Sequence, residues 1–204
     1  MLTFDEARHE YRWNGKVVPS VTQILKPCYD FSMVAPDVLE RKRTIGVAVH
    51  RAVELDIADD LERDSLAPEI EGYFSAWRAF REAAGLHAAD FGEVEVPLFN
   101  PRYGFAGTPD MAVFMSGEQW CVLDVKTAED LHPAVALQTA AYKELLNENA
   151  PKGGHKIKNR FALRLRANGT YRLDRFSDPL DWTTFLSFLT THRWREANLK
   201  GTTA

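Results

Sequence analysis

Hydrophobic residues recur along this chain with two different periods, which divide it into helical and extended segments. Apolar residues three or four positions apart predict helices, and these cover residues 21–27, 46–58, 68–84, 132–149 and the segment after Asp181. Alternating apolar and polar residues, or short apolar runs between turn residues, predict strands. These cover residues 3–18, 92–99, 105–115, 119–127 and 156–176. Asn-Gly pairs at Asn14-Gly15 and Asn168-Gly169 predict hairpin turns within the first and last of them.

Residues typical of helix ends support these boundaries. A serine or threonine is expected to cap the helix that follows Pro19-Ser20, and Asp181 is expected to cap the last helix. Pro133 stands at the start of the helix 132–149, and Gly85 follows the helix 68–84 as its C-terminal cap.

The order of the segments predicts an α/β fold in which a mixed central sheet is flanked by helices. Residues 1–90 carry the first hairpin and an N-terminal helical segment. Residues 91–204 carry three strands, a crossover helix, two further strands and a last helix. A chain of 204 residues fits a single domain with a sizeable core.

Composition narrows the class of protein. Hydrophobic residues make up 45% and charged residues 26% of the chain, which is typical of a soluble globular protein. There is no apolar run of the ~20 residues that cross a bilayer and no secretory signal pattern, so we expect a cytoplasmic protein without a membrane partner. Cys28 and Cys121 are expected to be reduced thiols, and two cysteines cannot bind a four-cysteine iron–sulfur cluster.

Charge is distributed unevenly. The net charge is −4, yet residues 152–175 hold eight Lys and Arg residues and one acid. Four of them share one strand face by parity: Lys158, Arg160, Arg164 and Arg166. Such a row fits the phosphate backbone of DNA without reading its sequence, although a solvated strand face fits equally well. Whether the row lies beside an active site stays open.

Two aspartates and a lysine carry the candidate chemistry. Adjacent strands joined by a hairpin can bring Asp110 next to Asp124, and the strand period of two puts Lys126 on the same face as Asp124. A solvated salt bridge is the plainer interpretation, but the apolar flanks of residues 119–127 predict burial, where unpaired charges are costly. Paired carboxylates suit Mg²⁺ or Mn²⁺, and such ions promote hydrolysis of phosphodiesters.

Four motifs occur in an order that resembles the PD-(D/E)xK nuclease superfamily, in its RecB-like branch of phage-type exonucleases. The motifs are G-x-x-x-H at residues 46–50, G-x-x-D at 107–110, D-x-K-T at 124–127 and Q-x-x-x-Y at 138–142. The resemblance covers roughly residues 19–145. It implies a restriction-endonuclease-like core and a DNA exonuclease of phage or prophage recombination, with one or two Mg²⁺ or Mn²⁺ ions.

The resemblance also assigns roles to single residues. Asp110, Asp124 and His50 are similar to the family's metal ligands, with the Val125 carbonyl as a further ligand. Lys126 resembles the catalytic lysine. Gln138 and Tyr142 resemble a pair that supports the site and contacts DNA. Glu95 is similar to an acidic position that supports the ligands, while Glu54 is expected to be solvated or paired along its own helix.

Two other functions remain open. The chain could be a DNA-binding scaffold that keeps the fold but does not cut, or a metal-dependent phosphodiesterase with another substrate. A recombinase or single-strand annealing partner, or a homo-oligomer, would fit the family. The sequence leaves open exo- or endonucleolytic cutting, its polarity, strand preference and DNA or RNA as substrate.

Overall fold

A computed structural model describes residues 1–152 and 154–199. Its centre is a five-stranded mixed sheet in the order β10-β9-β8-β7-β4, in which β8 and β9 are parallel and the other pairs antiparallel. The strands are β4 (Phe91–Val94), β7 (Met111–Met115), β8 (Gln119–Lys126), β9 (Asn159–Leu165) and β10 (Tyr171–Phe176). The expected α/β fold with a mixed sheet is confirmed.

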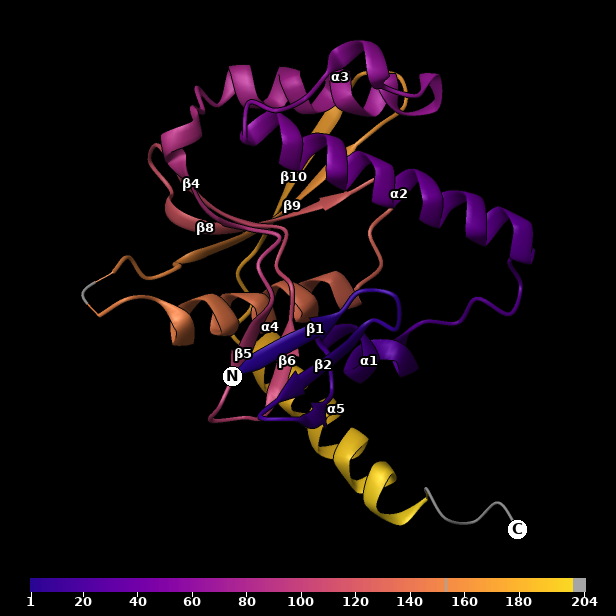
Figure 1. Cartoon of the computed structure of the whole chain (residues 1–204), viewed down its shortest axis with the longest axis vertical. Helices are drawn as coiled ribbons and strands as arrows, with labels where there is room; N and C mark the ends of the chain where they lie inside the picture. The colour runs from indigo at the N-terminus through magenta and orange to yellow at the C-terminus, as the bar shows by residue number, and fades with distance from the viewer. Residues whose placement is uncertain (153, 200–204) are drawn as a thin grey trace.

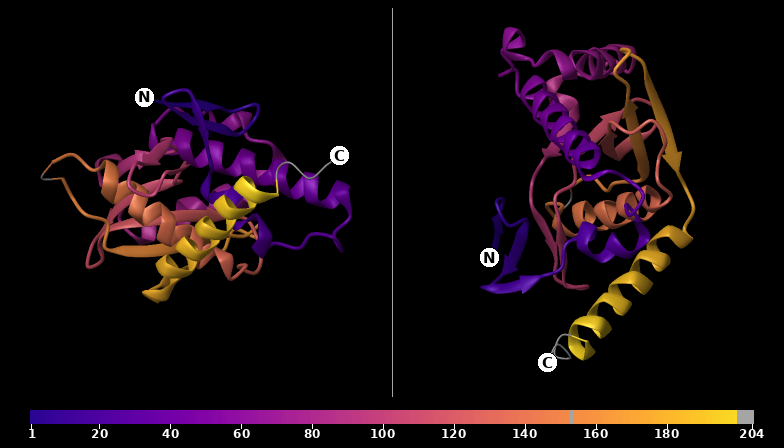
Figure 2. Two further views of the ribbon diagram at one scale, coloured as in Figure 1. Left: turned by 90° about the horizontal axis from the view of Figure 1, so that it is seen from below. Right: turned by 90° about the vertical axis from the view of Figure 1, so that its right-hand side faces the viewer.

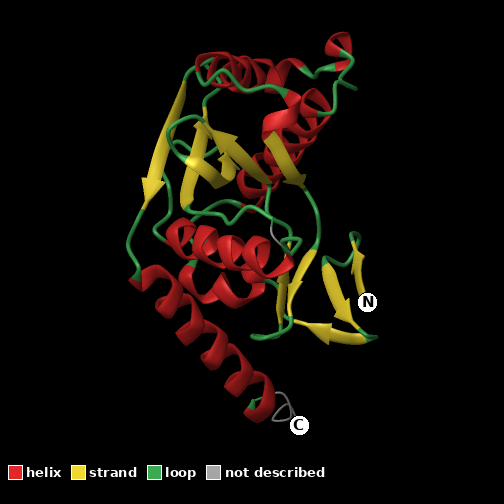
Figure 3. Ribbon diagram, turned by 90° about the vertical axis from the view of Figure 1, so that its left-hand side faces the viewer, coloured by secondary structure: helices red, strands yellow, loops and turns green. Residues whose placement is uncertain are grey.

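Helices cover both faces of this sheet. On one face lie α2 (Pro36–Ile57) and α3 (Pro68–Ala83), and on the other lie α1 (Val21–Leu25), α4 (Ala134–Asn149) and α5 (Leu180–Asn198). Figures 1 and 3 show the resulting layers, and Figure 2 shows α5 extending away from the sheet. Among the described residues there are also three short 3-10 helices, η1 (Lys26–Cys28), η2 (Arg63–Ser65) and η3 (Ala88–Asp90).

Alternation along the buried strands separates the two cores. In β8, Leu123 and Val125 pack against the α2 and α3 layer, whereas Val122 packs against the α4 layer. Asp124 has the parity of Val122, so the strand period places it on the α4 side. The pattern that predicted the strand therefore also sets which layer its polar residue meets.

Two expected strands are each divided. Residues 92–99 form β4 and then β5 (Leu98–Asn100), because Glu95 adopts φ +50° and Pro97 lacks a backbone donor. Residues 105–115 form β6 (Phe105–Gly107) and then β7, since Pro109 interrupts the ladder. β5 and β6 pair with each other outside the central sheet, so the prediction of continuous strands was wrong at both places.

The N-terminal strands form a separate small sheet of β1 (Leu2–Asp5), β2 (Glu10–Trp13) and β3 (Lys16–Val18). The hairpin at Asn14-Gly15 is confirmed. The hairpin at Asn168-Gly169 is confirmed as well, between β9 and β10.

Helix boundaries agree with the expected caps in most places. Ser20 caps α1 with a reciprocal bond to Gln23, and Gly85 follows α3 with φ +63°. However, α2 begins at Pro36 rather than Gly46. Its first ten residues are mostly exposed and lack an apolar stripe, so the spacing of hydrophobic residues did not predict this part of the helix. Asp181 does not cap α5: the Asp178 carboxylate accepts the Leu180 N–H instead.

Two close contacts fix α2, α3 and the β9–β10 turn relative to one another. Buried Asp56 of α2 accepts hydrogen bonds from Trp77, Arg78 and Arg81 of α3. At Gly72 of α3, a Cβ would overlap the carbonyl oxygen of Ala167 in the turn. The absence of a side chain at Gly72 therefore permits this approach.

Two further observations concern the whole chain. Among the described residues, no helix combines the length and the apolar character needed to cross a bilayer. Cys28 and Cys121 are free thiols, as expected.

Candidate metal centre

The candidate site lies where β7 begins and β8 ends, beneath α2. The antiparallel register pairs Met111 with Leu123, so Asp110 and Asp124 come from neighbouring positions of adjacent strands. Gly117, with φ +81°, lies in the turn that joins these strands. The hairpin thus brings together the two aspartates as the sequence predicted.

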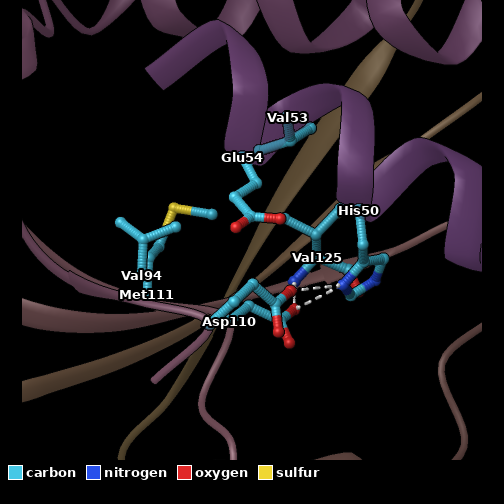
Figure 4. A pocket seen from close by; sticks show the side chains of 8 residues that line it. His50, Val53, Glu54, Val94, Asp110, Met111 and Val125 are labelled. Atoms are coloured by element: carbon cyan, nitrogen blue, oxygen red, sulfur yellow. Dashed lines mark hydrogen bonds and ion pairs between the residues drawn. The ribbon is translucent and has the colours of Figure 1, made fainter. Parts of the chain in front are cut away.

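His50, Glu95 and Asp110 form a compact group of possible metal ligands. One ligand atom from each lies within 4.8 Å of the other two. His50 Nδ1 is 3.2 Å from Glu95 Oε1 and 3.6 Å from Asp110 Oδ2. Figure 4 shows the Asp110 carboxylate directed at His50 and the Val125 backbone. The group could hold a metal ion.

Glu95 belongs to this group because of the break after β4. Its backbone has φ +50° and its N–H donates to the Asp110 carbonyl at 2.9 Å. A regular strand would alternate its side chains evenly, so the break sets the direction of Glu95. Glu95 was expected only to support the ligands, whereas the structure places it beside His50 and Asp110 as a possible ligand itself.

His50 is held at both ring nitrogens. Nε2 lies 3.1 Å from the Val125 carbonyl and Nδ1 faces the Glu95 carboxylate. Burial opposes a charge on the ring, but Asp110 and Glu95 outweigh it and raise the pKa of His50 to about 9. In the metal-free protein the imidazolium can therefore donate to both acceptors, and the Val125 carbonyl, expected as a metal ligand, accepts from His50.

Asp110 is almost fully buried and is oriented by the backbone. Its Oδ2 accepts the Val125 N–H at 2.6 Å. Burial raises the pKa of Asp110, although the cations of His50 and Lys126 act in the opposite direction. An ion at this place would favour the ionised carboxylate.

Asp124 and Lys126 form a buried ion pair beside this group. Lys126 Nζ lies 2.6 Å from Asp124 Oδ2, and Asp124 is 0% exposed. Despite that short distance, neither Asp124 oxygen receives a well-directed hydrogen bond from the described residues. Burial, opposed by Lys126 and assisted by Asp110, raises the pKa of Asp124 to about 6. This carboxylate therefore has lone pairs available for a cation.

The donor set fits a divalent cation. Carboxylate oxygens are the ligands of Mg²⁺ and Mn²⁺, and imidazole is a common ligand of several transition metals. Buried carboxylates without adequate hydrogen bonds are unfavourable unless a cation compensates them. Glu54 also lines the pocket, but it pairs with Arg51 at 2.6 Å along α2, as expected.

Gln138 and Tyr142 lie on one face of α4, next to the carboxylates. Gln138 Nε2 donates to the Tyr142 hydroxyl at 3.0 Å, and both side chains are buried. Burial, with the nearby Asp124 and Asp110 carboxylates, raises the pKa of Tyr142 well above its ordinary value. The expected grouping of this pair with the site is observed.

Two tyrosines near the site carried no recognisable signal in the sequence. Tyr11 of β2 shares a hydrogen bond of 2.8 Å with the Thr108 hydroxyl. Burial raises the pKa of Tyr29, and the charges of Lys126 and Asp124 also act on it. Both come from N-terminal segments whose position beside the site depends on long-range packing.

The predicted basic row is not a continuous exposed surface. Arg160 is buried and donates to Asp181 and to the Ala136 and Asp178 carbonyls. Arg164 is buried and bonds Asp174 and the Glu129 carbonyl. The expectation that Arg160 and Arg164 contact phosphates was therefore wrong, because both side chains are buried and bind acceptors inside the protein.

The other two members of that row have different surroundings. Lys158 is exposed and precedes β9. Arg166 follows β9 and lines a separate cleft. Strand parity therefore holds for Arg160 and Arg164, whose face is covered by α4 and the segment before it, but not for Lys158 and Arg166, which lie outside β9.

Neither a scan of the chain against protein-family models nor a search of curated proteins gives a match.

Proposed function

We propose that this chain is a divalent-metal-dependent nuclease that hydrolyses phosphodiester bonds of DNA. The observation that carries the proposal is the buried Asp110–Asp124 pair with Lys126 at 2.6 Å from Asp124. The group of His50, Glu95 and Asp110 beside it supports the same interpretation. The order of the four motifs adds the resemblance to RecB-like nucleases.

The proposed ligands are Asp110, Glu95 and His50, together with the Asp124 carboxylate, whose Oδ2 also forms the ion pair with Lys126. One or two Mg²⁺ or Mn²⁺ ions bound there would lower the pKa of a water molecule and offset charge on the scissile phosphate. His50 must lose a proton to act as a ligand, because a ligating imidazole is neutral. Because Nδ1 faces the carboxylates, Nε2 would keep its proton and its hydrogen bond to the Val125 carbonyl, which would hold the ring in orientation.

Lys126 acts beside these ligands as a fixed positive charge. Burial opposes its ionisation, yet Asp124 and Asp110 outweigh burial and raise its pKa. The side chain is therefore an ammonium, which suits orientation of the attacking water and stabilisation of charge on the phosphate rather than removal of a proton. Gln138 and Tyr142 lie on the α4 side of these carboxylates and are hydrogen-bonded to each other.

The test is cleavage of linear DNA in Mg²⁺ or Mn²⁺ by wild type, Asp124→Ala and Lys126→Ala. We expect each variant to lose activity by about 100- to 1000-fold, while Lys16→Ala, at an exposed lysine of β3 outside the site, keeps it. Equal activity of wild type and both site variants would refute the assignment. Calorimetry with Mn²⁺ then separates a non-cutting scaffold, which need not bind the ion, from an enzyme with another substrate.

We further propose exonucleolytic cutting, which rests on the motif order alone. The measurement is a time course on end-labelled linear DNA beside closed circular DNA of the same sequence. Loss of the linear form with the circle intact is expected. Cutting of the circle at a similar rate would show an endonuclease.

A further inference from the structure

A second concave surface lies next to the candidate metal centre and has no part in it. It is an open cleft of about 660 Å³ between α2, α3, the segment after β8 and the β9–β10 turn. Lys42, Tyr73, Thr127 and Arg166 are among the residues that line it. Its walls are polar and apolar in similar measure and include two basic and two acidic residues, a lining that is not the mainly apolar one of a pocket for a small hydrophobic ligand.

Two chain segments run from this cleft directly into the metal centre. Thr127 in the cleft wall follows Lys126 in the sequence. Along α2, Lys42, Gly46 and His50 are four residues apart and share one helix face. Eight residues of helix span roughly 12 Å. A Cβ at Gly46 would lie 3.7 Å from Thr127 Oγ1, so α2 passes close to the end of β8 between the two sites.

The cations of this cleft differ from the other basic residues of the segment 152–175. Arg160 and Arg164 are saturated by internal acceptors. Arg166 Nε, in contrast, is buried and finds no hydrogen-bond acceptor among the described residues. Neither Arg166 nor Lys42 forms an ion pair with any residue that the structure describes.

The cleft also contains two acidic residues, Glu129 and Asp130. Both are associated with Arg164: the Asp130 carboxylate lies 3.8 Å from its Nη1, and the Glu129 carbonyl accepts from Nη1 at 2.6 Å. The Asp130 carboxylate therefore lies toward Arg164, whereas Glu129 contacts that arginine through its backbone alone. Among the described residues neither acid forms an ion pair with Arg166, whose charge remains available to an anionic ligand.

We propose that this cleft binds a backbone phosphate of the substrate strand, away from the phosphate that is cut. This inference rests on the proposed nuclease function for the identity of the strand. Arg166 and Lys42 neutralise the phosphate, and the Thr127 and Tyr73 hydroxyls are available as donors. A separation of roughly 12 Å corresponds to about three to four nucleotides of a stacked strand, at 3.4 Å each.

The experiment pairs variants of the protein with single neutral linkages in the DNA. Fluorescence anisotropy in EDTA measures binding of a labelled oligonucleotide in which one methylphosphonate is moved along the strand. For wild type, we expect one region of the strand where a neutral linkage weakens binding about five- to twentyfold. In Arg166→Gln, binding of the fully charged strand weakens by a similar factor, and the neutral linkage in that region has no further effect.

Controls separate this contact from general charge and from folding. Arg172→Gln removes one charge from a side chain that is 64% exposed on β10, and it should keep the positional pattern of wild type. Arg166→Lys keeps the charge and should retain most of the affinity. Arg166→Gln should also reduce the salt dependence of binding by about one phosphate.

Two results overturn the inference: no binding of DNA by the wild type, or the same positional pattern in wild type and Arg166→Gln. Each of these binding results can be distinguished from failure of the nuclease assignment, because the binding assay contains no metal ion and requires no cleavage. If wild type cuts DNA and Asp124→Ala does not, an unchanged pattern in Arg166→Gln refutes only the phosphate site.

Discussion

The buried carboxylate of Asp124 leads to a definite prediction for Asp124→Asn in the metal-free protein. Burial, against the effect of Lys126, raises the pKa of Asp124 from 3.8 to about 6. One pKa unit corresponds to ~1.4 kcal/mol, so the ionised side chain destabilises the folded chain by about 3 kcal/mol. Asparagine has nearly the same shape and no charge. We expect the free energy of unfolding at pH 8 in EDTA to increase by about 2 to 3 kcal/mol, because the buried amide offsets part of the gain.

The direction of the pKa shift also fixes how this difference varies with pH. The folded pKa of Asp124 exceeds the unfolded value of 3.8. The stability that its protonated form contributes is therefore fully present below pH 3.8 and is lost as the pH rises through about 6. Wild type and Asp124→Asn should be equally stable at acid pH and differ most above neutrality.

Urea unfolding followed by tryptophan fluorescence, at several pH values in EDTA, measures this difference. The urea dependence of the unfolding free energy should be unchanged. Asp60→Asn, at an exposed position, serves as the control and should have little effect. A variant less stable than wild type at pH 8 would refute the reasoning, because it would show that the Lys126 ion pair outweighs the burial of Asp124.

Three other predictions follow from the same contacts. Saturating Mn²⁺, at 100 times its dissociation constant, should stabilise wild type by about 2.7 kcal/mol, and Glu95→Gln should lose most of this gain in a thermal unfolding assay. Gly72→Ala should lower the free energy of unfolding by about 1 to 3 kcal/mol because its Cβ would overlap Ala167, although alanine is normally the better helix former. Glu71→Ala is the exposed control on the same helix. A Gly72→Ala variant more stable than wild type would contradict the geometry. Asp56→Asn should cost about 2 to 3 kcal/mol in urea unfolding, since it weakens charged hydrogen bonds to its tryptophan and arginine partners; an unchanged midpoint would show that they contribute little.

Local pattern was sufficient wherever one segment fixes its own geometry. The alternation in β8 placed Asp124 and Lys126 on one face, and the four-residue spacing in α4 placed Gln138 beside Tyr142. The two Asn-Gly turns were likewise predicted from the sequence, because few residues adopt the backbone conformation that these turns require. Each of these features depends on neighbours a few positions away.

Tertiary structure decided which of several similar residues have internal partners and which remain available for a ligand. Nothing in the sequence distinguishes Arg166 from Arg160 and Arg164, yet internal acids and carbonyls satisfy the latter two. Likewise, the role of Glu95 depends on a backbone break that sets it against His50 of α2.

The sequence by itself thus determined the α/β class, the adjacent aspartates and the lysine, because strand period and hairpin turns act over short distances. Only the tertiary structure decided which residues form the group of possible metal ligands, which arginines are used internally, and where the cleft lies. These depend on contacts between segments 20 to 80 residues apart, such as His50 with Val125 and Arg160 with Asp181. Such contacts form only when the helical layers close over the sheet.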